Sequence, residues 1–145
     1  MRLQITLPGK PYPQPRVRFA KFGAYHSKEH RERVKVTADY LKESATLQGW
    51  EKTMGPVKVT IITVSPCPQK LRRQVGATGK RLYKPTRPDI DNYAKYILDC
   101  CSRADNIWKD DSTVVELVQK DFYGKFEEEP YTQVTIETID TYGDL

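Results

Sequence analysis

The pattern of apolar and polar positions predicts six regular elements in the chain. Residues 3–7 alternate apolar and polar side chains, as a half-buried strand does, and the β-branched run VKVTIITV at 57–64 is typical of a central strand. Apolar residues one helical turn apart predict a helix from the N-cap Ser27 to about residue 47. The remaining predicted elements are a helix from about residue 90 and strands within 110–123 and 131–139.

The order of these elements, β-α-β-α-β-β, shows no internal repeat and no linker. We therefore predict one α+β domain over residues 1–145, a mixed sheet with helices packed on one face. Two long segments lack periodicity. Residues 8–26 are rich in proline, glycine, basic and aromatic residues and are predicted to be loop or extended chain, and residues 65–88 form a second, basic loop.

Composition excludes several classes of protein. Three cysteines (Cys67, Cys100 and Cys101) and two histidines give neither a disulfide framework nor zinc-finger spacing. No apolar run approaches the roughly 18–20 residues of a membrane span, and the first residues lack the apolar core of a signal peptide. We expect a cytoplasmic protein without a membrane partner.

Charge is segregated along the chain, although the net charge is only +5. Residues 1–35 carry nine Lys/Arg against two acids, residues 66–88 carry seven against none, and residues 89–145 carry five against fourteen. This pattern favours a polyanion gripped by two basic segments around an acidic centre, whereas the alternative is two solvated loops and an acidic tail. The residues predicted to contact the phosphates of a nucleic acid are Arg16, Arg18, Lys21, Lys70, Arg72, Arg73, Lys80, Arg81, Lys84 and Arg87. In the first segment these cations alternate with Phe19, Phe22 and Tyr25, which are suited to packing against sugars or unstacked bases.

Two aspartates, Asp89 and Asp91, stand where the second helix begins. One interpretation is structural, with Asp89 as the N-cap and Asp91 as a first-turn acid favoured by the helix dipole. The other is a metal site. Lys95 lies one helical turn after Asp91, so that its ammonium group can reach the same side of the helix.

A second acidic pair, Asp110 and Asp111, precedes the following strand. Because a helix and the next strand commonly pack together, we expect Asp91 and Asp111 to lie close to each other. Carboxylates that converge on one point need a hard cation, and Mg²⁺ is the natural candidate. The chain offers no serine–histidine–aspartate set and no glycine-rich phosphate loop, so metal-assisted phosphodiester hydrolysis fits best.

The motifs RPDIDNYAKYILDCC and IWKDDSTVVELVQKDFY resemble the RusA-type Holliday-junction resolvases, whose signature is D-x-D-N-x-x-K followed by W-x-D-D-x-x-V. The N-terminal GKPYPQPRVRF is similar to the P-x-x-P-R-x-R-F segment of that family. The resemblance covers nearly the whole chain. It implies a small homodimeric, Mg²⁺-dependent endonuclease, common in prophages, that cuts four-way DNA junctions symmetrically in recombination and repair.

Carried over onto this sequence, the resemblance implies a set of site residues. Asn92 matches the asparagine of the first motif, and alignment on Trp108 favours Asp111 over Asp110 as the third acid. The implied catalytic residues are Asp89, Asp91, Lys95 and Asp111, and the implied metal ligands are Asp89, Asp91, Asp111 and Asp110. His26 is given no role.

Two other functions remain open at this point. A junction-binding protein without activity would use the same basic segments, with the acids serving only the fold. An antitoxin-like or RNA-directed metal nuclease would share the scaffold. Metal-dependent cleavage would distinguish a junction endonuclease from the inactive binding protein. A comparison of junction, duplex and RNA substrates would distinguish it from the RNA-directed nuclease.

Overall fold

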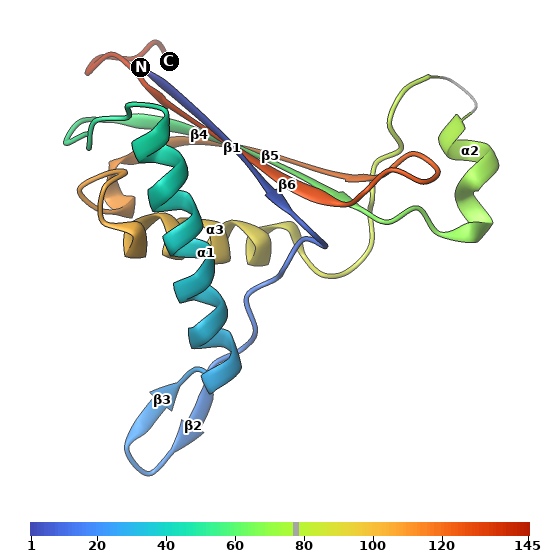
Figure 1. The fold of residues 1–145 in the computed structure, drawn as a ribbon, viewed down its shortest axis with the longest axis horizontal. Coiled ribbons are helices and arrows are strands. Elements are labelled where there is room, and N and C mark those ends of the chain that lie inside the picture. Colours follow the sequence, from blue (N-terminus) through green and yellow to red (C-terminus); the bar gives the residue numbers. More distant parts are fainter. Residues whose placement is uncertain (77–78) are drawn as a thin grey trace.

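A computed structural model of the chain describes residues 1–76 and 79–145 and shows a four-stranded sheet with two long helices on one side (Figure 1). Its strands are β1 Arg2–Pro8, β2 Arg18–Ala20, β3 Gly23–Tyr25, β4 Val57–Ser65, β5 Val114–Tyr123 and β6 Tyr131–Thr138. Its helices are α1 Lys28–Leu47, α2 Arg72–Gly76 and α3 Ile90–Ala104, with 3₁₀ turns η1 Gln69–Leu71 and η2 Asp111–Thr113.

The main sheet has the strand order β1-β6-β4-β5. Strand β4 pairs antiparallel with β6 and parallel with β5, so it is central and the sheet is mixed. Both features were predicted from the sequence, and the α+β class is confirmed. Strands β1 and β5 form the two edges.

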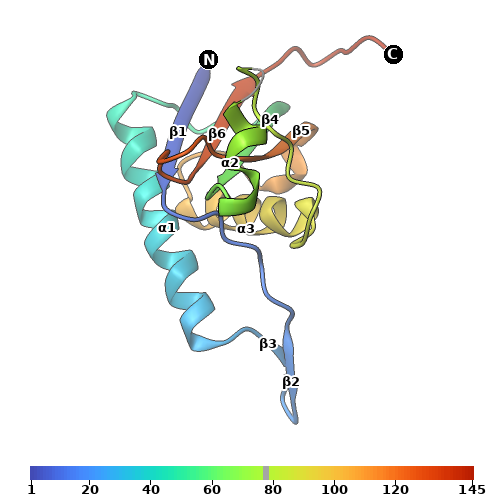
Figure 2. The same cartoon turned by 90° about the vertical axis from the view of Figure 1, so that its right-hand side faces the viewer.

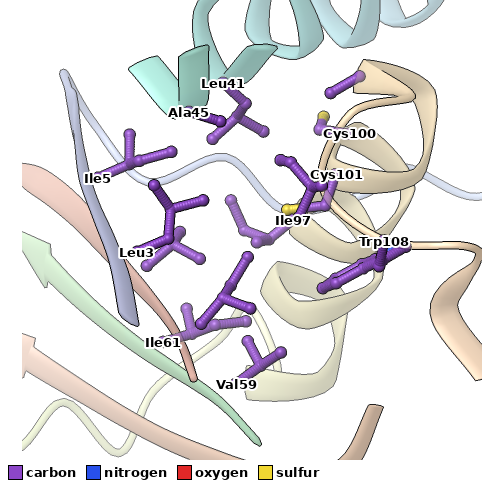
Figure 3. Packing of buried hydrophobic residues seen from close by; sticks show 14 of the residues in the cluster. Leu3, Ile5, Leu41, Ala45, Val59, Ile61, Ile97, Cys100, Cys101 and Trp108 are labelled. Atoms are coloured by element: carbon purple, nitrogen blue, oxygen red, sulfur yellow. The ribbon is translucent and has the colours of Figure 1, made fainter. Parts of the chain in front are cut away.

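Helices α1 and α3 cover the same face of the sheet, as the two views show (Figures 1 and 2). Their apolar stripes meet the buried residues of the strands, with Leu41 and Ala45 of α1 and Ile97 of α3 among the side chains of the core (Figure 3). Cys100 and Cys101 are buried in this core, and burial raises the pKa of the Cys100 thiol to about 12. These thiols pack in the core.

Both segments predicted to be irregular contain short regular elements, and this is a correction. Residues 18–25 form the hairpin β2–β3, and residues 69–76 form η1 and α2. Each strand of the hairpin has only three residues, too few for an alternating pattern to be recognised. Residues 77–78 of the second predicted loop lie outside the described residues.

None of the helices in residues 1–76 and 79–145 has the length and apolar character needed to cross a membrane.

Candidate active site at the N-terminus of α3

Asp89 occupies the N-cap position of α3, as predicted, but its side chain makes no capping hydrogen bond. The first turn is instead closed by the backbone, where the Asn92 amide donates to the Asp89 carbonyl at 3.1 Å. A carboxylate in a true cap would be occupied by the helix amides. Asp89 therefore leaves its carboxylate available to a ligand, which weakens the purely structural interpretation.

Asp91 and Lys95 form the ion pair that their spacing predicted. The Lys95 Nζ lies 3.6 Å from the Asp91 Oδ2, and about two thirds of each side chain is exposed. A pair this exposed adds little to stability because water screens it. Its consequence is geometric, since an ammonium group and a carboxylate share one exposed turn of α3.

The N-terminal basic segment forms a wall of this site. Gln14 joins the segment to α3 twice, through its amide to the Asn92 carbonyl at 3.0 Å and through its side chain to Asp99 at 3.1 Å. These bonds bring Arg16, Phe19 and His26 to a hollow that Asp89, Asp91, Asn92 and Lys95 also line. The connection made by Gln14 was not predicted, because no spacing in the sequence links positions so far apart.

Asp121 is a buried acid near the site that the sequence analysis did not single out. It lines a second hollow together with Asp89, accepts a hydrogen bond from Thr63 Oγ1 at 2.8 Å and pairs with the Lys84 ammonium at 3.8 Å. Burial raises its pKa, and the bonds to Thr63 and Lys84 oppose that rise. The sequence offered no reason to select Asp121, because a charged residue near the end of a predicted strand is usually exposed.

Two of the cations predicted to contact DNA are instead used within the fold. The Lys84 side chain is only 9% exposed and also donates to the carbonyls of Thr86 and Arg87. Arg81 makes a bidentate pair with Glu128, at 2.6 and 2.7 Å. These bonds support the segment that leads into α3 and place both residues among the structural contacts.

The other predicted cations fall into two groups. Arg16, Arg18 and Lys21 are exposed on and beside the hairpin, whereas Lys70, Arg72 and Arg73 are exposed on η1 and α2. Arg72 lies over the ring of Phe126, 4.2 Å from its centroid. Lys80 is exposed, and Arg87 lines the two hollows on either side of Pro88.

Asp110 and Asp111 do not join Asp89 and Asp91 within one chain, and this corrects the expected convergence. They follow the C-terminal end of α3, where the Trp108 indole donates to Ser102. The 15 residues of α3 separate the two acidic pairs by about 22 Å of helix. Among the described residues no group of three or more histidine, cysteine, aspartate or glutamate side chains is placed to hold a metal.

The two members of the second pair have different environments. Asp110 caps η2, accepting from the Ser112 amide at 2.7 Å and from the Ser112 hydroxyl. These bonds lower the pKa of Asp110. Asp111 is exposed and outside this cap. The structure therefore gives Asp110 a local role and leaves Asp111 as the member available to a ligand.

Together these features define a class of protein: a small α+β domain with an acidic helix N-terminus beside basic, DNA-compatible segments. The sequence profile of the family described as "Endodeoxyribonuclease RusA" matches residues 8–137. The chain is also 30% identical over 146 aligned positions to "Uncharacterized protein YqaN" from Bacillus subtilis (strain 168), covering 94% of this chain and 96% of that protein. The chain therefore belongs to the RusA family of endodeoxyribonucleases, the RusA-type Holliday-junction resolvases, and membership implies an endonuclease that acts on Holliday junctions.

Proposed function

We propose that this protein is a Mg²⁺-dependent endonuclease that resolves four-way DNA junctions by symmetric cuts, in DNA recombination and repair. The observation that carries the proposal is the placing of two exposed carboxylates, Asp89 and Asp91, in one hollow with Lys95 and Arg16. Acids that hold a metal and cations that hold a phosphate are thereby adjacent. The proposed site of action is the cytoplasm, on chromosomal or prophage DNA.

Asp89 and Asp91 are the residues proposed to hold the metal. Both present hard oxygen donors, and Mg²⁺ is commonly held by one or two carboxylates together with substrate phosphates. Bound there, Mg²⁺ would lower the pKa of a coordinated water and would stabilise negative charge on the phosphodiester. Neither carboxylate is occupied by a helix cap, so the donor set of this chain fits the ion.

The remaining residues of the hollow orient the DNA. Lys95, one turn after Asp91, is proposed to bind a non-bridging oxygen of the scissile phosphate. Arg16, which lines the same hollow, is proposed to hold a neighbouring phosphate. Guanidinium and ammonium groups fixed before the reaction stabilise the charge that develops on phosphate oxygens in the transition state.

A second copy of the chain is proposed to supply Asp111. Strand β5 carries the exposed residues Val115 and Leu117, which are 60% and 43% accessible. Along its outer edge, the described residues pair with β5 only near its C-terminal end, where Tyr83 forms a bridge to Phe122. The free backbone groups of such an edge favour pairing with another strand.

Antiparallel pairing of two β5 edges has a consequence for the site. Asp111 precedes β5, while Gln119, the sixth of the ten residues of β5, donates to the Ile90 carbonyl at the start of α3. A two-fold axis near Val115, midway along the chain between Asp111 and Gln119, would carry each Asp111 toward the partner's Asp89 and Asp91. The proposed homodimer thus has two composite sites, as two symmetric cuts require.

The experiment that tests this function compares three substrates. Purified protein is incubated with a labelled four-way junction, with linear duplex of the same sequence and with RNA, in Mg²⁺ and in excess chelator. We expect paired cuts in the junction that need Mg²⁺. Binding without cleavage under every metal condition supports the inactive junction-binding alternative, and preferential RNA cleavage supports the RNA-directed nuclease.

A further inference from the structure

The hairpin β2–β3 is a projecting element with an apolar and basic surface. Every residue of its two strands is exposed, and both views show it extending beyond the body of the domain (Figures 1 and 2). Arg18 pairs with Tyr25 and Ala20 with Gly23, so Lys21 and Phe22 form the turn at its tip. Such an extension adds no packing to the core.

Two phenylalanines on the hairpin remain uncovered. Phe19 and Phe22 are each 79% exposed, and among the described residues the one ring that lies against either of them is Tyr25, 5.2 Å from Phe22 between centroids. Large aromatic side chains exposed together are unfavourable in water and commonly mark a binding surface. The hairpin therefore carries two ring faces available to a partner.

The charge around these rings identifies the chemistry of that partner. Residues 9–28 contain five Lys/Arg and no acid, and Arg16, Arg18 and Lys21 lie beside or between the two phenylalanines. Aromatic rings interleaved with cations are suited to nucleic acid, since the rings stack on bases while the cations bind phosphates. A protein partner with an apolar patch would not require this uniform positive charge.

The hairpin also adjoins the candidate active site. Phe19 in the middle of β2 lines the same hollow as Asp91 and Lys95, while Phe22 stands at the tip. A DNA strand held with its phosphate at Lys95 would therefore lie close to Phe19. In continuous duplex the base faces are covered by their neighbours, whereas a branch point exposes them.

The geometry points to the hairpin as the element that recognises the branch point, with Phe19 and Phe22 stacking on bases unstacked at the centre of a four-way junction. The inference rests on the proposed function and extends it, because it assigns selectivity for branched DNA to residues outside the carboxylate site. Binding of linear duplex depends on the cations, and preference for the junction depends on the rings.

The test measures affinity for a four-way junction and for linear duplex with the same arms, in Ca²⁺ so that substrate remains intact. For Phe19→Ala with Phe22→Ala we expect junction affinity to fall at least about tenfold while duplex affinity changes less than about threefold. Phe19→Trp with Phe22→Trp should restore the preference, whereas Phe19→Leu with Phe22→Leu should not, because leucine is apolar but does not stack. The matched control is Tyr142→Ala, an aromatic residue 87% exposed in the C-terminal tail.

A second readout reports on the bases directly. With 2-aminopurine at the branch point, the change in fluorescence on binding should be smaller with the double alanine variant than with the wild type and the Tyr142→Ala control. Equal junction preference in the double alanine variant and the wild type overturns the inference, and so does full rescue by leucine. A wild type that shows no junction preference instead overturns the proposed function, so the two failures are distinguishable.

Discussion

At the scale of single residues, the acids near the site divide into those used by the fold and those left available. Asp110 caps η2 and Asp121 is bonded to Thr63 and Lys84, whereas Asp89 makes no cap and Asp111 lies outside one. Sequence spacing identified three of these four residues, because DxD and DD are recognisable motifs. It did not separate their roles, since hydrogen bonding to distant Thr63 and Lys84 is set by the tertiary fold.

The buried pair of Lys84 and Asp121 gives a prediction about stability. Lys84→Met leaves the carboxylate without its cation, and the free energy of unfolding at pH 7 should fall by roughly 3–5 kcal/mol. Burial already raises the pKa of Asp121 above its ordinary value near 3.8, and removal of Lys84 should raise it further. Urea unfolding of both proteins between pH 7.5 and pH 5 provides the measurement.

The pH dependence of that loss has a definite sign. A carboxyl whose pKa is higher in the folded than in the unfolded protein destabilises the fold above that pKa, and the penalty disappears as pH falls and the group becomes protonated. The difference between Lys84→Met and wild type should therefore shrink toward pH 5. If Lys84→Met has unchanged stability but binds DNA weakly, Lys84 contacts DNA rather than stabilising the fold.

At the scale of elements, the long periodic segments were predictable and the short ones were not. The helix beginning after Ser27 and the central strand β4 follow their apolar patterns closely, and Ser27 accepts the capping hydrogen bond from the His30 amide. The hairpin and α2 have strands of three residues and a helix of five, which are too short for a period to be read. The convergence of Asp91 with Asp111 was predicted wrongly, because α3 runs between them.

Helix α2 gives a prediction about salt dependence. Arg72 and Arg73 are exposed on this element, and we expect them to bind DNA phosphates. Removal of one phosphate-binding cation should make the slope of log K against log salt shallower by about 0.9 on duplex arms. For Arg72→Ala with Arg73→Ala, the measurement is junction and duplex affinity at several salt concentrations.

The control for this pair is Lys42→Ala, which removes an exposed cation from α1. It should leave the slope nearly unchanged. The expected effect of the double variant is similar on junction and duplex, because a phosphate contact carries no information about branching. A slope equal to that of the wild type would exclude α2 from the DNA interface.

At the scale of the whole molecule, the separation of the two acidic pairs along α3 is the reason for proposing a composite dimeric site. One chain presents Asp89 and Asp91 at one end of α3 and Asp111 beyond the other end, just before the edge strand β5. We expect a homodimer in sedimentation at micromolar concentration. Only monomer, with and without DNA, would contradict the proposed β5 interface.

Mixing two inactive variants tests whether the sites are shared between protomers. Asp91→Asn and Asp111→Asn should each fail to cut. In a mixed dimer, one composite site combines the intact Asp91 of one protomer with the intact Asp111 of the other, so nicking of one junction strand should return. Sites formed within single chains predict no activity in any mixture, and refolding the two variants together ensures exchange.

The proposed metal site is tested most sharply by Asp91→Asn itself, with cleavage rate and junction affinity measured on the same folded protein. The substitution removes one anion while keeping the size of the side chain. If Asp91 holds the metal, the cleavage rate in Mg²⁺ should fall by a factor of hundreds or more, while junction affinity is kept or slightly strengthened. If Asp91 is only a first-turn acid, the change should cost a fraction of a kcal/mol of stability, and cleavage near the wild-type rate would contradict the proposed metal site.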